Sequence, residues 1–323
     1  MLAKELIQRV REIQIRTGRQ VADVLAGQYE SVFRGRGMEF EEVRPYIPGD
    51  DVRTIDWNVT ARMGGPYVKR YVEERQLTLM MMADISASQD FGSAGRSKRE
   101  ATAELCALLA FAATSNDDKV GLTLFHGSIE QYIPARKGQK HSLRVIRDVL
   151  AHGTGETPEE LATRTRMARR RWLPLGRKRT AQRPDRQSTN IAGAMEFLMS
   201  VTTRKTVCFV VSDFLDDGFL KPMRNTNRKH DVIAVLVTDA RESEIPNVGM
   251  IHLADPETGR IAVYDSGATG FREAVLRASN ERVESLRRSF GASGIDFIHI
   301  DAAGSIVDPL AKFFRMRERR MRR

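Results

Sequence analysis

A short polar loop follows an apolar run in the first third of the chain. The run at residues 77–83 has the length and composition of a strand buried on both faces, and the loop at residues 84–88 reads DISAS. Open α/β sheets form their sites at the carboxyl ends of strands. The carboxylate of Asp84 and the hydroxyls of Ser86 and Ser88 are hard oxygen ligands at alternate positions, which suit Mg²⁺. We therefore predict a metal-binding loop here.

Two more oxygen-bearing side chains fall where loops at the same sheet edge should converge. Thr189 precedes a predicted helix at residues 191–201, and Asp213 directly follows an apolar strand at residues 206–212. Taken singly, such residues are ordinary helix caps or turn residues. Taken with the DISAS loop, they complete one predicted metal site. Its five residues are Asp84, Ser86, Ser88, Thr189 and Asp213.

Alternating strands and helices are expected to position these groups. We expect strands at residues 77–83, 119–125, 129–133, 206–212, 231–237, 261–264 and 295–300. We expect helices at residues 97–114, 140–150, 191–201, 219–228, 271–290 and 308–319. The strands at 119–125 and 129–133 are close enough to form a hairpin. The pattern predicts an α/β fold, a doubly wound and mostly parallel sheet flanked by helices.

The N-terminal part has a different pattern. Apolar residues at helical spacing predict an amphipathic helix over residues 2–26. Strand-like alternation at residues 31–33, 38–46 and 67–72 predicts a small β-rich subdomain. We therefore divide the chain into three parts. They are residues 1–75, residues 76–311 with a basic insertion at 153–187, and a basic tail at 312–323.

The positive charge is concentrated in two segments. The net charge is +10, while residues 153–187 hold ten Arg and Lys against four Asp and Glu, and residues 312–323 hold seven against one. Each segment therefore carries +6, and the remainder is near −2. The basicity belongs to the insertion and the tail and not to the folded body.

Composition also bears on the cellular compartment. No apolar run approaches the ~18 residues of a membrane span, so no transmembrane segment is expected. The charged N-terminus does not resemble a signal peptide, and we expect a cytoplasmic protein. Cys106 and Cys208 lie in apolar segments and are expected to be small core residues.

The site motif resembles that of a known class. Asp-x-Ser-x-Ser with a later Thr and a later Asp is similar to the metal-ion-dependent adhesion site of von Willebrand factor A domains. The segments GRGMEFEEVRPYIPGDDVRTIDWNVTAR, KRYVEER, DKVGLTLF and VVSDF extend the likeness. With them, residues 25–265 resemble the bacterial family called domain of unknown function 58. The insertion at 153–187 departs from the family by its length.

The resemblance implies coordination and not turnover. It implies a von Willebrand factor A-like fold with one antiparallel strand, and a site that holds Mg²⁺, with Mn²⁺ or Ca²⁺ as alternatives. One coordination position would stay open for a carboxylate from a client protein. Relatives are associated with MoxR-type AAA+ ATPases, which implies an adaptor role in protein maturation or stress response.

Two other functions remain open. The first is a Mg²⁺-dependent phosphoesterase, but no second carboxylate beside Asp84 and no histidine near either motif offers a general acid or base. We therefore expect no catalytic residues. The second is binding of nucleic acid or an anionic membrane surface through the insertion and tail. The tail lacks the interleaved aromatic residues that stack on bases, so nucleic acid is disfavoured.

Overall fold

The structure is a computed structural model that describes residues 26–33, 38–73, 77–93, 95–152, 189–254 and 261–321. The helix expected at residues 2–26, apart from its last residue, lies outside the described residues. So does the whole basic insertion at 153–187.

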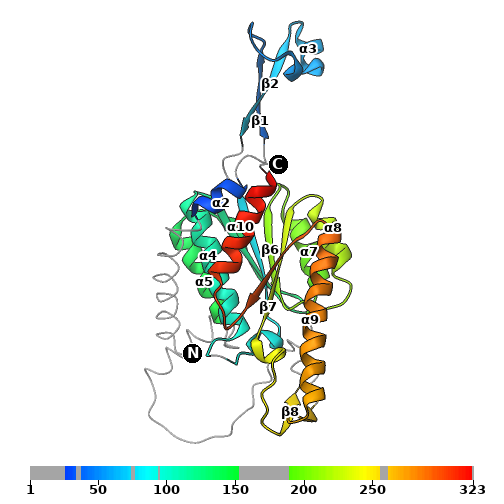
Figure 1. The fold of residues 1–323 in the computed structure, drawn as a ribbon. Helices are drawn as coiled ribbons and strands as arrows, with labels where there is room; N and C mark the ends of the chain where they lie inside the picture. The colour runs from blue at the N-terminus through cyan, green and yellow to red at the C-terminus, as the bar shows by residue number, and fades with distance from the viewer. Residues whose placement is uncertain are drawn as a thin grey trace, which may run out of the picture.

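A six-stranded sheet forms the centre of the molecule (Figure 1). Its strands are β3 (Thr78–Asp84), β4 (Lys119–Phe125), β5 (Ile129–Arg136), β6 (Val207–Ser212), β7 (Asp231–Thr238) and β10 (Asp296–Asp301). They lie in the order β10-β7-β6-β3-β4-β5. All neighbouring pairs are parallel except β4 and β5, which form the predicted hairpin. The predicted α/β fold with a mostly parallel sheet is confirmed.

Helices cover both faces of this sheet (Figure 1). The face that carries the larger apolar cluster is covered by α2 (Ala26–Phe33), α4 (Lys98–Ser115), α5 (Gln139–His152) and α10 (Val307–Met321). The opposite face is covered by α7 (Ile191–Val201), α8 (Leu220–Asn227) and α9 (Thr269–Ala292). The chain therefore builds three layers, with the core divided between the two faces of the sheet.

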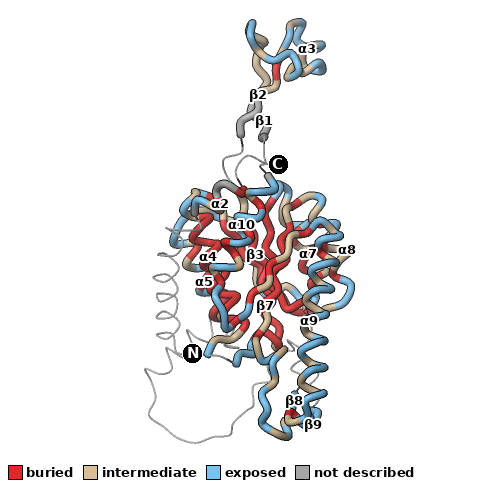
Figure 2. The backbone as a smooth tube through the Cα atoms, in the orientation of Figure 1, coloured by how far each residue is buried: buried red, intermediate tan, exposed pale blue. Residues whose placement is uncertain are grey.

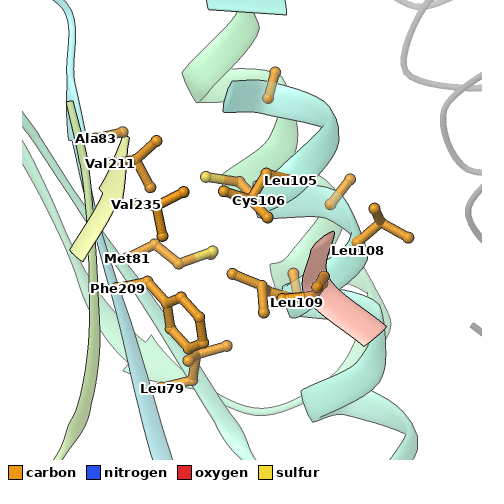
Figure 3. Close-up of a cluster of buried hydrophobic side chains, with 14 of the residues drawn as sticks. Leu79, Met81, Ala83, Leu105, Cys106, Leu108, Leu109, Phe209, Val211 and Val235 are labelled. Atoms are coloured by element: carbon orange, nitrogen blue, oxygen red, sulfur yellow. The ribbon is translucent and has the colours of Figure 1, made fainter. Parts of the chain in front are cut away.

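Strand β3 supplies both halves of the core because its side chains alternate between the two faces. Leu79, Met81 and Ala83 point toward α4, where they pack in the cluster shown in Figure 3. Met80 and Met82 point to the other face. All five side chains are buried, and Figure 2 shows the central strands as the most buried part of the molecule. Burial on both faces explains the continuous apolar run in the sequence.

The N-terminal segment forms an arm at one end of the sheet, as Figure 1 shows. It consists of the antiparallel strands β1 (Met38–Pro45) and β2 (Tyr67–Glu73), the 3-10 turn η2 (Val52–Thr54) and helix α3 (Trp57–Met63). The expected β-rich character holds for the strands, but α3 was not expected. The Asp56 carboxylate accepts bonds from the N–H groups of Asn58 and Val59, and Gly64 ends the helix at φ 72°.

Tertiary packing corrects one expectation and explains another. Residues 31–33 were expected as a strand but end helix α2, because Tyr29 and Phe33 share one helix face that packs on Phe314 of α10. Residues 312–321 belong to α10, which confirms the helix predicted at residues 308–319 and includes most of the segment set apart as a basic tail. Phe313 and Phe314 are buried, so this basic helix is anchored to the sheet by its apolar side.

The remaining elements are small. Strands β8 (Met250–Ala254) and β9 (Ile261–Asp265) form a separate antiparallel pair, of which only β9 was expected. The 3-10 turns η3 (Ala87–Asp90) and η4 (Ala240–Glu242) follow β3 and β7. Among the described residues, no helix has the length and apolar character needed to cross a membrane.

The packing of α10 on the body gives the first prediction. Replacing the fully buried Phe314 by Ala is expected to lower the free energy of unfolding by about 3–5 kcal/mol, because it leaves a cavity between α2 and α10. Urea denaturation measures this change. Leu215→Ala, at a side chain that is 54% exposed, is the control and should change stability by less than about 1 kcal/mol. Similar losses in both variants would contradict the assigned packing.

Candidate functional site

The centre of the sheet contains a topological switch point. From β3 the chain moves to β4 on one side, and the later strand β6 pairs with β3 on the other side. Both pairs are parallel, so the carboxyl ends of β3 and β6 open at the same edge. Open α/β sheets bind ligands at such a point. Asp84 ends β3, and Asp213 directly follows β6.

The DISAS loop folds back on the end of β3. The backbone N–H of Ser86 donates to Asp84 Oδ1 at 2.8 Å, and the Oγ atoms of Ser86 and Ser88 lie 3.1 Å apart. Asp84, Ser86 and Ser88 are all buried, at 1%, 0% and 4% exposure. The loop therefore presents its carboxylate and both hydroxyls from a short, internally bonded turn.

Thr189 reaches the same place from the start of α7. The Asn190 backbone N–H donates to the carbonyl of His126 at 2.9 Å, which fixes this segment to the end of β4. The Asp216 carboxylate, on the loop after β6, accepts a bond from the Ile191 N–H at 2.9 Å. Held in this way, the Thr189 hydroxyl donates to Asp84 Oδ2 at 3.4 Å.

Asp213 is held by a buried lysine. Lys98, at the first position of α4, places Nζ 2.9 Å from Asp213 Oδ2 and 2.6 Å from Glu242 Oε1. Lys98 and Asp213 are each 1% exposed. Burial opposes the charged form of Lys98, but the two carboxylates raise its pKa above the ordinary value. The guanidinium of Arg282 donates to the backbone carbonyl of Asp213.

The two site carboxylates repel each other. Burial, and then the charge on Asp213, raise the pKa of Asp84 to about 6, although bonds from Ser212 and Ser86 act in the opposite direction. The Ser212 hydroxyl donates to Asp84 Oδ2 at 2.6 Å. The structure therefore brings the five predicted residues to one buried site in which negative charge is not fully compensated.

These residues fit a hard cation. Asp213 Oδ1 is buried and has no hydrogen-bond partner, so it is a ready ligand. The remaining donors are carboxylate and hydroxyl oxygens, as Mg²⁺ prefers. In the described part of the chain, no group of three or more His, Cys, Asp or Glu side chains could hold a metal. The candidate site differs from such groups because three of its five ligands are hydroxyls.

Several residues of the site were not anticipated from the sequence. Lys98 follows a helix cap, and nothing in its local pattern indicates that it reaches Asp213. Ser212 was signalled only by its place before Asp213 in VVSDF. Asp239 caps η4 and accepts a bond at 2.9 Å from the N–H of Ser93, which lies just beyond η3. It ties the segment after the DISAS loop to the turn that carries Glu242.

Comparison with known proteins places the chain among uncharacterised relatives. The family model described as "Protein of unknown function DUF58" matches residues 42–285. Uncharacterized protein Rv1480 of Mycobacterium tuberculosis (strain ATCC 25618 / H37Rv) is 26% identical over 311 residues, which covers 96% of this chain and 89% of the relative. Uncharacterized protein Mb1516 of Mycobacterium bovis matches with the same identity and coverage.

Two solved structures resemble this chain at low sequence identity. The conserved hypothetical protein BatB from Bacteroides thetaiotaomicron is 14% identical, with a TM-score of 0.40 over 75% of this chain and 99% of that chain. An aerotolerance-related membrane protein from Bacteroides fragilis is 16% identical, with a TM-score of 0.39 over 76% of this chain and 100% of that chain. Similarity at this level does not bear on function.

The charge balance at Asp84 predicts a pH dependence in the absence of divalent cations. Its pKa is about 6 in the folded chain against an ordinary 3.8, so the folded state binds the proton more tightly. This contribution to stability is complete below pH 3.8 and is lost as the pH rises through about 6. Asp84→Asn cannot ionise and should avoid that loss, which is up to about 3 kcal/mol.

Urea denaturation in EDTA at pH 4.5 and pH 7.5 measures the effect. The parent chain should lose stability relative to Asp84→Asn as the pH rises. Asp217→Asn, at an exposed position, should follow the parent. Parallel stability curves for the parent and Asp84→Asn would refute the raised pKa.

The ion pair of Lys98 gives a second test. Lys98→Met keeps the length of the side chain but leaves Asp213 buried without its counter-charge, so unfolding free energy in EDTA should fall by about 3–5 kcal/mol. Added Mg²⁺ should stabilise this variant more than the parent. Lys221→Met, at an exposed position on α8, is the control. Urea denaturation with and without Mg²⁺ measures the stabilisation of each protein by the ion. The same stabilisation in Lys98→Met and in the parent would refute this prediction.

Proposed function

The chain belongs to the family described as protein of unknown function DUF58, and from this premise we propose that it is a metal-dependent protein-interaction module with a von Willebrand factor A-like fold. The sheet order β10-β7-β6-β3-β4-β5, with antiparallel β5 at one edge, supports that fold. The observation that carries the function is the buried Asp213 Oδ1 atom, which has no hydrogen-bond partner. It belongs to a site with four other oxygen-bearing side chains, all of them buried.

Each residue of the site has a definite role in this proposal. Asp84 anchors the site from the end of β3, and its Oδ2 atom receives bonds from Ser212 and Thr189. Ser86, Ser88 and Thr189 supply neutral oxygens, and Asp213 supplies the unpartnered carboxylate oxygen. A bound Mg²⁺, Mn²⁺ or Ca²⁺ would offer an open position to a carboxylate oxygen of a partner.

The contacts around the carboxylates favour docking over turnover. In the described part of the chain, the groups bonded to the carboxylates of Asp84 and Asp213 are hydroxyls, a backbone N–H and Lys98. Lys98 is not poised as a general base near neutral pH, since its pKa is raised, and Asp84, whose pKa is about 6, would be engaged by the bound cation. We propose that the chain recognises a partner and does not transform a substrate.

We propose that the partner is a MoxR-type AAA+ ATPase, for which the chain acts as an adaptor in protein maturation or stress response. A client protein would offer the carboxylate that completes the site. The support for this part is the resemblance of the DISAS, VVSDF and N-terminal motifs to those of the family.

Metal binding is tested by titrating the chain with Mn²⁺ and Mg²⁺ in a calorimeter. Ser88→Ala and Thr189→Val each remove one hydroxyl ligand without changing the charge, and each should weaken binding about tenfold or more. Ser200→Ala, at an exposed hydroxyl on α7, should bind like the parent. Equal affinity in all four proteins would exclude the proposed site.

The partner is tested by capturing the ATPase from its own cell extract on the immobilised chain. Capture should need Mg²⁺ and be lost in EDTA or in Asp213→Ala. Capture that is indifferent to chelator and to the substitution would exclude a metal-dependent interaction.

A further inference from the structure

A large groove lies at the sheet edge formed by β10, away from the site at β3 and β6. Its volume is about 1060 Å³, at the upper end for small-molecule pockets, which span roughly 300–1,000 Å³. None of its lining residues belongs to the candidate metal site. Its size suits a segment of polymer better than a small metabolite.

The groove runs along the edge of β10 and not over one face of the sheet. Three consecutive residues of the strand line it: Phe297, Ile298 and His299. Successive side chains of a strand point to opposite faces, so a hollow bounded by all three must open at the edge. Ile298 packs in the core cluster on the α10 side, and Phe297 packs on the opposite side. Helices α9 and α10 therefore form the two walls.

The edge of β10 is open among the described residues. β10 is the terminal strand of the sheet and pairs only with β7 in that part of the chain. An edge strand presents unpaired backbone N–H and C=O groups to any extended chain laid beside it. Figure 1 shows the strand running between α9 and α10. The groove thus has the geometry needed for addition of a further strand.

The walls of this groove are strongly basic. Arg287 of α9 lies on one wall, and the other basic lining residues are Lys312, Arg315, Arg319 and Arg320 of α10. Among the described residues that line the groove, Asp308 is the only acidic one.

Some of these cations already have partners, and others do not. Arg320 bonds to Asp296, and Arg287 bonds to Glu284. In contrast, Lys312, Arg315 and Arg319 are exposed and make no ion pair with a described carboxylate.

We propose that this groove binds an extended acidic segment of another protein, which adds to β10 as a further strand. The open backbone would hold the segment, and the three free cations of α10 would pair with its carboxylates. The long segment at residues 153–187 of this chain is a poor candidate, because it carries +6. The proposal is independent of metal binding at Asp84 and Asp213.

Charge alone would also suit a nucleic acid, but the groove lacks free aromatic rings. Single-stranded nucleic acids are held by bases stacked on exposed aromatic side chains. Phe313 is buried, the Phe297 ring already stacks on Phe290, and the Arg287 guanidinium lies 5.4 Å from the centre of the Phe297 ring. An apolar floor with an open strand edge favours polypeptide.

The test uses a fluorescein-labelled peptide of eight residues that alternates Glu and Val. Its affinity is measured by fluorescence anisotropy for the parent and for the combined variant Lys312→Glu, Arg315→Glu and Arg319→Glu. The control combines Lys221→Glu, Arg224→Glu and Arg277→Glu, which make the same charge change at exposed positions outside the groove. Circular dichroism checks that both variants are folded.

We expect the groove variant to bind about tenfold more weakly than the parent, and the control to stay close to the parent. A peptide with Lys in place of Glu should not bind. Hydrogen exchange should show that the bound peptide protects the backbone amides of β10, which mere charge attraction would not do.

Several results would overturn the proposal. The first is an equal loss of affinity in the groove variant and the control, and the second is peptide binding without protection of β10. Tighter binding of an eight-nucleotide oligo-dT would make the groove a nucleic-acid site. Absence of peptide binding would also overturn the proposal. The cations would then serve to prevent strand pairing between copies of the chain at this edge.

Discussion

Two buried carboxylates, Asp84 and Asp213, lie at the ends of adjacent parallel strands. Their mutual repulsion is the constraint for which the surrounding structure must compensate. A charge removed from water is costly unless it is paired and hydrogen-bonded. Lys98 forms an ion pair with Asp213, and hydroxyls and a backbone N–H donate hydrogen bonds to Asp84. One oxygen of Asp213 is left over. The folded site therefore keeps one carboxylate oxygen unpartnered, as the proposed metal site requires.

This balance depends on the packing of α4. The capping box formed by Ser97 and Glu100 starts that helix, and Lys98 follows the cap directly. The same helix contributes a long row of apolar side chains to the core against β3. The apolar contacts thus fix the height of α4 over the sheet, and that height places the Lys98 ammonium between Asp213 and Glu242. Core packing and site chemistry are coupled through one helix.

The basic charge of the C-terminal helix divides into two roles. Arg317 is buried, pairs with Asp231 and Asp296, and lies over the Phe33 and Phe313 rings. It holds α10 and α2 to the edge of the sheet. The exposed Lys312, Arg315 and Arg319 on the same helix make no ion pair with a described carboxylate, so they remain able to act on an external partner. A segment that looks uniformly basic in sequence therefore contains a buried arginine that stabilises the fold and exposed cations that face solvent.

The sequence by itself determined the α/β alternation, the buried central strands and the candidate residues at 84–88, 189 and 213, because apolar periodicity and local caps are short-range signals. Tertiary structure alone decided the rest. Residues 31–33 became helical through packing on Phe314, and α3 formed between the strands of the arm. Lys98 lies 115 positions from Asp213, so only the docking of α4 on the sheet could join them. The basic groove likewise exists only because α9 and α10 flank the open edge of β10.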